Sequence, residues 1–591
     1  MMQSNTHSHR DRGRISRETL DNAGPSRRTV LGWGLMTLMA AGCARVPSAP
    51  DKQSRTELSL LASAPPTVWD PAFIVDVSAQ QILQQVCPPL LSIDSSTGNL
   101  TGILASSASL NKAGTRLRVT LAKGLTFSDG TALDANALKA NFERWQNIAT
   151  TPSKPSAIDT LLADSASHPL IQRYETPTHN VLDVHFTRAC FSFPEALTHP
   201  GLGVLSPASF RANETDPVTE TIGAGAYRIE SKATTTAAQR EAKNTTTLKL
   251  RPKFFNERVS NASESASPSS SDADASTTEA STSSSLRAAP EKDQAPRTVS
   301  FVHTSAKISP AEWLASDHDS ATHTDIVDAI AIKEQKEIAQ AGLRVLHRDP
   351  HSVIYLGFNH DDEQLSHPAM RQAIVHNIDE RELLKDHYPE STLSANGFTP
   401  ASLGVQPERP FIREEKPTEE LLEAAGYTGQ SIPLAYPTGV RLPYLPRPEA
   451  TAQNIHEQLS EANITTHLKP MRWDTEFLPA LLKGEHTGLW IFGLHGLYRS
   501  PHDMLARLFS GANPLCNARL TDIPQRLDAA LTIASPTERR ETYKRIQKDL
   551  LTDLPLYPLI LPVSTIALSR DVTSYPLSSY LEEPLEYVTL K

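Results

Sequence analysis

Residues 116–145 read RLRVTLAKGLTFSDGTALDANALKANFERW. The first ten residues, 116–125, alternate apolar and polar side chains, which predicts a half-buried β-strand. Residues 128–130, Ser-Asp-Gly, predict a turn, because glycine accepts positive φ and the aspartate side chain bonds to nearby backbone. Asp134 is placed to cap a helix that runs through ANALKANFERW. The stretch therefore predicts a strand, a turn and a helix in immediate succession.

Similar patterns continue towards the C-terminus. Residues 224–230 and 246–255 are typical of a strand pair, and residues 353–358 of a buried strand. A helical pattern begins at Pro368. Because strands and helices go on alternating to about residue 560, we expect an α/β fold.

Residues 260–296 have a different composition, dominated by Ser, Thr, Ala, Asp and Glu. Large apolar side chains are almost absent, so this stretch cannot bury enough surface to offset the entropy of ordering. We therefore expect a disordered surface insertion, after which a strand resumes at 296–302.

Length and composition limit the possible functions. A chain of 591 residues predicts two or three domains, and a hydrophobic fraction of 39% is sufficient for globular cores. The formal net charge of -10 leaves no basic face for phosphate backbones, so we do not expect nucleic acid as a partner.

Residues 26–43, SRRTVLGWGLMTLMAAGC, are typical of an export signal. Their apolar run is too short to span a bilayer. Arg27 and Arg28 resemble the twin-arginine export pattern, and the small residues before Cys43 resemble a lipoprotein cleavage box. We expect residues 1–42 to be removed and Cys43 to carry the lipid. The alternative is a short buried helix beside a chance pair of arginines.

The opening stretch resembles a signature of the extracytoplasmic solute-binding proteins of peptide and nickel ABC importers, the bacterial solute-binding family 5. Residues 222–227 (IGAGAY), 358–384 and 421–427 (LLEAAGY) resemble further markers of that family, in the family's order. The similarity extends, with gaps, from about residue 58 to 580.

This resemblance implies an α/β, two-lobed periplasmic-binding-protein-like fold with a hinge and an extra subdomain in the first lobe. Ligand would be enclosed between the lobes, whose closure it favours. The expected parts are a signal peptide (1–42), a tether (43–57), the first lobe (58–99, 216–340 and 561–591), its subdomain (100–215) and the second lobe (341–560).

In this family the segment that follows a second-lobe strand lines the cleft, and here it is residues 489–503. Peptide-binding members place an aspartate early in this loop to pair with the peptide's α-ammonium, whereas this chain has Leu494 and Leu497 there. A guanidinium can bind a carboxylate with two hydrogen bonds, and an imidazole can ligate a metal. The candidate ligand contacts are Trp490, His495, Tyr498 and Arg499.

Structural roles are the alternatives for these four residues. In that case Trp490 belongs to the strand core, and His495 is not a ligand. Arg499 is then solvated or paired internally.

Nothing in the sequence nominates a catalytic set. His456 and Glu457 begin an HExxH pattern, but Ser460 stands at the second histidine position. There is no GxSxG elbow, P-loop or GxGxxG run. We therefore expect no enzyme activity, no catalytic or metal-ligating residues and no cofactor.

The cysteines are few and form no CxxC pair, which argues against a structural zinc site. They are Cys43, Cys87, Cys190 and Cys516. If Cys43 is lipidated, at most one disulfide forms among the other three, and the sequence leaves its pairing open.

The resemblance implies a lipid-anchored substrate-binding component of an ABC importer, which captures peptides or a similar small polar solute for the membrane permease. Binding of nickel or a metal chelate is the alternative within the family, and a secreted hydrolase or a surface adhesin is less favoured. The implied partners are the permease subunits, the ligand and, through the lipid anchor, the membrane. We expect an extracytoplasmic monomer at the cell membrane.

Overall fold

The computed structural model describes residues 55–591 with gaps at 63–64, 95–96, 152–155, 212–213, 234–243, 252–253, 255–285, 289–293, 304–308, 319, 321–322, 386, 408–415, 511–514, 517 and 519. The predicted signal peptide with Arg27 and Arg28, the lipidation site Cys43 and nearly all of the tether lie outside the described residues. Most of the predicted insertion, 260–296, does too.

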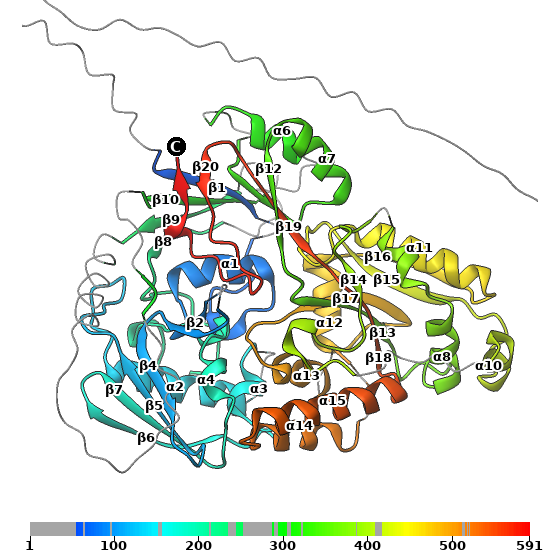
Figure 1. The fold of residues 1–591 in the computed structure, drawn as a ribbon, viewed down its shortest axis with the longest axis horizontal. Coiled ribbons are helices and arrows are strands. Elements are labelled where there is room, and N and C mark those ends of the chain that lie inside the picture. Colours follow the sequence, from blue (N-terminus) through cyan, green and yellow to red (C-terminus); the bar gives the residue numbers. More distant parts are fainter. Residues whose placement is uncertain are drawn as a thin grey trace, which may run out of the picture. The chain divides into compact units, whose positions relative to one another are not determined.

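A seven-stranded sheet forms the first lobe (Figure 1). Across the sheet its strands are β12 (Arg344–Arg348), β19 (Ser564–Leu568), β11 (Ile326–Asp328), β1 (Glu57–Ala62), β10 (Thr298–His303), β9 (Asn244–Leu250) and β8 (Tyr227–Ser231). The predicted pair at 224–230 and 246–255 is confirmed as the antiparallel strands β8 and β9. The helices of this lobe are α1 (Val77–Val86), α6 (Pro310–Ala315) and α7 (Ile332–Gln340).

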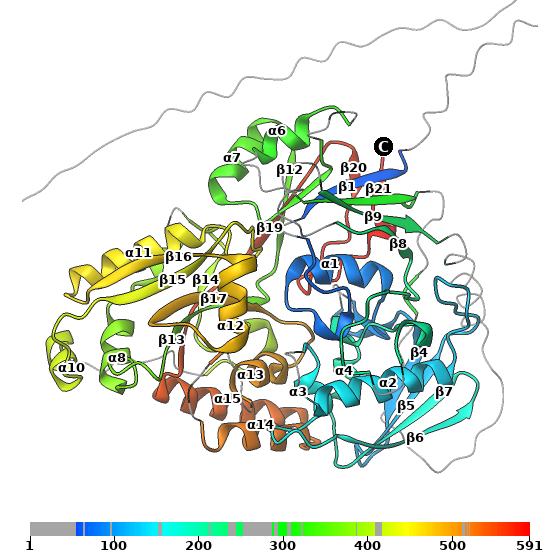
Figure 2. The ribbon, with the colours of Figure 1, turned by 180° about the vertical axis from the view of Figure 1, so that it is seen from behind.

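A six-stranded sheet forms the second lobe. In order it contains β14 (Leu393–Ser394), β18 (Leu556–Leu561), β13 (Ser352–Phe358), β17 (Leu489–His495), β15 (Ile432–Thr438) and β16 (Thr466–Arg472). Every residue of β13 is buried, as expected for the strand predicted at 353–358. The helices are α8 (Pro368–His376), α9 (Glu380–Leu384), α10 (Thr418–Ala424), α11 (Pro448–Glu461), α12 (Leu478–Lys483), α13 (Pro501–Phe509), α14 (Ile523–Leu531) and α15 (Pro536–Asp553). Figure 2 shows the second lobe from behind.

The opening stretch builds the subdomain, a four-stranded sheet covered by one long helix. The sheet order is β4 (Ala105–Leu110), β5 (Arg116–Leu121), β7 (Val181–Phe186) and β6 (Ile171–Thr178), and the helix is α2 (Ala135–Thr150). The strand is shorter than the predicted 116–125, because the chain turns at Gly124 with φ of 70°. The predicted cap is confirmed, since Asp134 accepts from the Ala137 backbone N–H at 2.8 Å.

Shorter elements complete the described residues. The strands are β2 (Leu91–Ile93), β3 (Leu100–Gly102), β20 (Val572–Ser574) and β21 (Thr589–Leu590). The short helices are α3 (Asp159–Leu162), α4 (Phe193–Ala196) and single turns at Pro71–Phe73, Pro200–Leu202, Pro207–Ser209, Ala401–Leu403, Trp473–Phe477 and Leu585–Tyr587.

Two short connections join the sheets of the two lobes. Residues 349–351 link β12 to β13, and residues 562–563 link β18 to β19. The predicted two-lobed α/β architecture is therefore present, and the chain crosses between the two sheets at these two connections. The second lobe was predicted to start at residue 341. Strand β12 nevertheless belongs to the first sheet, and its Leu346 packs against the core of the first lobe.

Residues 286–288 differ from the prediction of a disordered insertion. Leu286 packs against the core of the subdomain, and the Arg287 guanidinium pairs with Glu582 at 2.9 Å. Leu286 is the one large apolar residue in 260–296, and it is partly buried against the fold. The prediction of disorder is therefore wrong for residues 286–288.

Cys87, Cys190 and Cys516 are free thiols and all three are buried. Their burial raises the pKa of each thiol, which keeps it protonated. Among the described residues, no helix is long and apolar enough to cross a membrane.

Candidate functional site

A cavity of about 650 Å³ is lined by residues of both lobes and of the subdomain. Pockets of roughly 300–1,000 Å³ suit ligands of the size of small organic molecules. We call one side the acidic wall: the lining residues between 74 and 167, among them Asp76, Asp159 and Asp164. We call the other side the apolar wall: the lining residues between 437 and 528, among them Tyr444, Trp473, Phe477, Phe492, Leu494 and Leu497.

Asp76 caps the N-terminus of α1 at the edge of the cavity. Its side chain accepts from the Ala79 backbone N–H at 2.8 Å. Burial raises the pKa of Asp76 to about 6, and the backbone hydrogen bonds of the helix start only partly oppose that rise. Because a carboxylate with this pKa is mostly ionised at neutral pH, Asp76 presents a negative charge to the cavity.

Tyr444 lies on the apolar wall, and the charge of Asp76 affects its pKa. Burial raises the pKa of the Tyr444 phenol, and the Asp76 carboxylate raises it further. The Tyr444 ring packs directly over Gly493 of β17, where a Cβ atom would clash with it. The glycine therefore lets the ring lie against the strand and form part of the wall.

His495 ends β17 and is the one predicted ligand contact found among the described lining residues of the cavity. Its Nδ1 lies 2.9 Å from the Ser352 hydroxyl, and its ring centroid lies 5.6 Å from that of His351. Burial first, and then the neighbouring His351, hold the pKa of His495 well below its usual range. The imidazole is thus neutral at physiological pH and suited to hydrogen bonding or metal ligation.

The other three predicted contacts lie elsewhere in the described residues. Trp490 is 2% exposed, packs over Gly357 and stacks with His486 at a centroid distance of 5.2 Å. Tyr498 is also 2% exposed, in the core shared with the subdomain. Arg499 is exposed and donates to the Gly98 carbonyl of the first lobe. Their part in ligand binding stays a prediction.

An ion pair within α13 binds the backbone of the loop at 495–497. The Arg507 guanidinium donates to Asp503 at 2.8 and 3.0 Å and to the His495 carbonyl at 2.7 Å. Asp503 in turn accepts from the Leu497 backbone N–H at 2.6 Å. Because Asp503 is buried, this pair fixes the backbone that presents His495 and Leu497 to the cavity.

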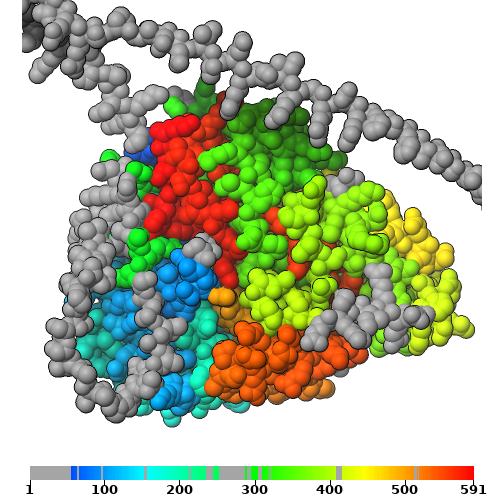
Figure 3. Space-filling view, viewed as in Figure 1, coloured from blue at the N-terminus to red at the C-terminus, as the bar shows by residue number. Residues whose placement is uncertain are grey.

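Direct contacts join the subdomain to the second lobe beside the cavity. Asp528 on α14 accepts from the Ser165 backbone N–H at 2.9 Å and from its hydroxyl at 2.5 Å, and it pairs with Arg188 at 3.3 Å. Figure 3 shows the orange residues of this part of the second lobe beside the cyan residues of the subdomain. A second ion pair joins the second lobe to the first lobe: Arg441 pairs with Glu334 of α7 at 2.6 Å.

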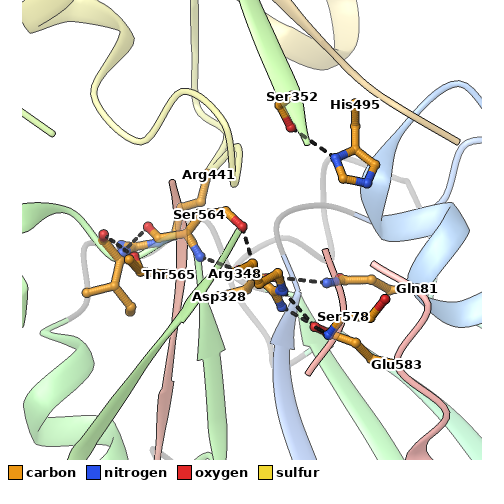
Figure 4. A network of polar contacts seen from close by, with 12 residues as sticks. Gln81, Asp328, Arg348, Ser352, Arg441, His495, Ser564, Thr565, Ser578 and Glu583 are labelled. Atoms are coloured by element: carbon orange, nitrogen blue, oxygen red, sulfur yellow. Dashed lines mark hydrogen bonds and ion pairs between the residues drawn. The ribbon is translucent and has the colours of Figure 1, made fainter. Parts of the chain in front are cut away.

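A buried polar network lies beside the connections between the lobes (Figure 4). Arg348, at the end of β12, donates to Asp328 at 2.8 and 3.1 Å and to Glu583 at 2.6 and 2.8 Å. Four residues further along, Ser352 contacts His495. The Arg348 network and the Ser352–His495 contact thus lie on either side of the crossing segment 349–351.

The sequence did not point to Asp76 or Tyr444 as site residues. A capping signal marks Asp76, since an acidic residue stands before the helical pattern of VSAQQIL. That signal says nothing of the cavity, because the two residues line one cavity only once the lobes are assembled.

The model of the bacterial extracellular solute-binding proteins, family 5 Middle, matches residues 99–515. The chain belongs to this family.

Curated relatives of this family 5 protein are distant. The peptide transport periplasmic protein SapA of Salmonella typhimurium is 24% identical, over 40% of this chain and 44% of SapA. The glutathione-binding protein GsiB of Escherichia coli O1:K1 / APEC is 20% identical, over 93% of this chain and 96% of GsiB. The chain thus spans less than half of SapA but nearly all of GsiB.

Solved structures share the fold. The dipeptide-binding protein of Pseudoalteromonas sp. SM9913, in complex with Met-Leu, has a TM-score of 0.73 at 19% identity and covers 90% of this chain and 100% of its own. NikA of Staphylococcus aureus, in complex with Ni(L-His)2, has a TM-score of 0.69 at 14% identity, over 91% of this chain and 100% of its own. Within the described residues, no group of three or more His, Cys, Asp or Glu side chains is placed to hold a metal ion.

Proposed function

We propose that this protein is the substrate-binding component of an ABC importer, and that it captures a peptide or a similar small solute between its two lobes. The observation that carries the proposal is the cavity of about 650 Å³, whose lining residues come from both lobes, and the lobes are joined at 349–351 and 562–563. Lobes joined by short connections can close around a ligand that binds the closed state more tightly.

The peptide class is supported by the relatives and by the lining. SapA and the dipeptide-binding protein are peptide binders by name, and GsiB binds the peptide-like glutathione. The acidic wall carries three aspartates, and the apolar wall carries aromatic and aliphatic side chains together with Lys483, Arg507 and Asp528. This lining suits a solute with ionic groups and apolar side chains. Delivery to permease subunits then follows as the role of the monomeric binding protein.

The proposal includes the location of the protein. The family is extracellular by description. We extend this to a lipid anchor at Cys43, after export directed by Arg27 and Arg28 and removal of residues 1–42. The purpose of such an anchor is to keep a diffusing receptor beside its permease, without a membrane-spanning helix.

Binding of a nickel chelate is the second candidate, and His495 is the observation that favours it. Its neutral imidazole lines the cavity, and NikA shares the fold in a complex with Ni(L-His)2. A chelated metal needs fewer protein ligands than a bare ion, so a single imidazole would be sufficient there.

Calorimetric titration separates the two candidates. Di- and tripeptides are titrated into the purified protein in one series, and Ni(L-His)2 in another, with ester and amide substrates as a check for turnover. Micromolar or tighter binding of peptides without hydrolysis is the expected result. Binding of the nickel complex alone contradicts the peptide assignment, and hydrolysis contradicts a pure binding role.

A further inference from the structure

The carboxylates that line the cavity differ in whether a cation lies beside them. Asp164 lies 3.2 Å from His168, and Asp528 pairs with Arg188 at 3.3 Å. Among the described residues, no cationic side chain lies within ion-pair distance of Asp76 or of Asp159. Asp159 is held by its neighbour Ser156, through the backbone N–H and the hydroxyl.

Asp76 therefore carries a charge that only backbone groups stabilise. A half-buried carboxylate without a cation is costly in free energy, as its raised pKa shows. Such a group in a ligand-sized cavity favours a ligand that brings the missing positive charge.

Tyr444 provides the second half of the site from the opposite wall. The residue is 7% exposed, and its hydroxyl makes no hydrogen bond with other described residues. Asp76 and Tyr444 both line the cavity, from its two walls, and no hydrogen bond joins them within the described residues. A ligand that fills the cavity meets both oxygens, and a primary ammonium has three N–H donors to offer them.

Two leucines of the apolar wall stand in the loop where the family resemblance suggests an acidic residue. Leu494 and Leu497 occupy the loop positions at which peptide-binding members carry an acidic residue, and both line the cavity. Building on the proposed solute-binding function, we propose that Asp76 binds a primary ammonium group of the ligand and that the Tyr444 hydroxyl accepts a second N–H from it. The Leu494 and Leu497 surface then takes an apolar group adjacent to the amine.

The ligand class is thus an apolar compound with a free primary amine, of which a peptide with an apolar N-terminal residue is one source. A small amine without peptide bonds is the other. Recognition of the amine has moved from the second-lobe loop to the first helix of the first lobe, so the ammonium would bridge the two lobes.

The test is calorimetric titration of three probes: Leu-Leu, N-acetyl-Leu-Leu and 3-methylbutan-1-amine. They are titrated into the wild-type protein and into the variants Asp76→Asn, Asp159→Asn and Asp134→Asn. Asn keeps the helix cap that Asp76 provides. The matched control is Asp134, which caps α2 in the same way outside the cavity.

We expect the wild type to bind Leu-Leu at least about tenfold more tightly than its acetylated form, and Asp76→Asn to lose about the same factor, while Asp134→Asn binds like the wild type. Equal affinity for the free and acetylated dipeptides, unchanged binding by Asp76→Asn, or the loss in Asp159→Asn instead overturns the inference and leaves the peptide-binding function standing. Should Asp76→Asn fold poorly, Asp76→Ser replaces it, because serine also caps a helix and carries no charge.

The remaining outcomes separate the inference from the proposed function. Binding of 3-methylbutan-1-amine but not Leu-Leu, with the loss in Asp76→Asn, supports the amine site and contradicts the peptide class. Binding of neither compound overturns both.

Discussion

Arg348 donates to the Glu583 carboxylate through Nε at 2.6 Å and through Nη2 at 2.8 Å, with a side chain that is 1% exposed. The same guanidinium donates to Asp328. One buried cation at the crossing between the lobes is therefore matched to two carboxylates.

Replacing Arg348 by Met should reduce the free energy of unfolding by about 3–5 kcal/mol, because Asp328 and Glu583 would remain buried without a cation. Urea denaturation measures the loss. Arg381→Met is the control, since Arg381 makes an exposed pair with Asp379, and solvent-exposed pairs contribute little to stability. Equal effects of the two substitutions would show that the Arg348 network does not stabilise the fold.

Asp528→Asn should weaken the closed arrangement of the lobes. The amide keeps an acceptor for Ser165, but it loses the ion pair with Arg188 and one charge-assisted contact. We expect ligand affinity to fall a few-fold and the radius of gyration of the unliganded protein, from X-ray scattering, to rise. A variant at Asp522, which pairs with Arg526 on the exposed side of α14, should change neither quantity.

The raised pKa of Asp76 should be visible in the pH dependence of the free energy of unfolding. Its pKa is about 6 in the folded protein and lower in the unfolded chain, so the folded state takes up the proton first as pH falls. This group therefore lowers stability as pH rises from about 4 to 6. In Asp76→Asn we expect that part of the slope to vanish and the unliganded protein at pH 7.5 to gain about 1–2 kcal/mol, after allowance for screening by solvent in the cavity. An unchanged pH profile would contradict the shifted pKa.

Trp490→Phe distinguishes core from ligand contact. Its indole packs over Gly357 and His486, outside the described lining of the cavity. We expect a stability loss of about 1–3 kcal/mol in thermal unfolding, with ligand affinity within twofold of the wild type. A large loss of affinity at unchanged stability would restore Trp490 as a direct ligand contact.

Many elements of the fold could be predicted from local sequence patterns. The strand at Arg116, the Asp134 cap and the buried strand of Val353 follow from alternation, capping chemistry and continuous apolar runs, which depend on neighbours in the chain. The lobed arrangement came from the order of family markers, since periodicity alone does not set which strands pair.

The site was harder to predict, and β17 shows why. Trp490 and His495 lie on the same buried strand, yet one packs on Gly357 and the other lines the cavity. An apolar run does not distinguish a core face from a cavity wall. Asp76 and Tyr444 belong to different lobes, so only the assembled fold brings them together.

The central claim is that the cavity between the lobes holds the solute. Thermal unfolding of the wild type and of Leu497→Trp, which fills the apolar wall, tests it most directly when both are scanned with di- and tripeptides and with Ni(L-His)2. A bound ligand at 100 times its Kd stabilises the protein by about 2.7 kcal/mol. We predict stabilisation of the wild type by peptides and none of Leu497→Trp, whereas equal stabilisation of the two proteins, or none of the wild type, would contradict the account.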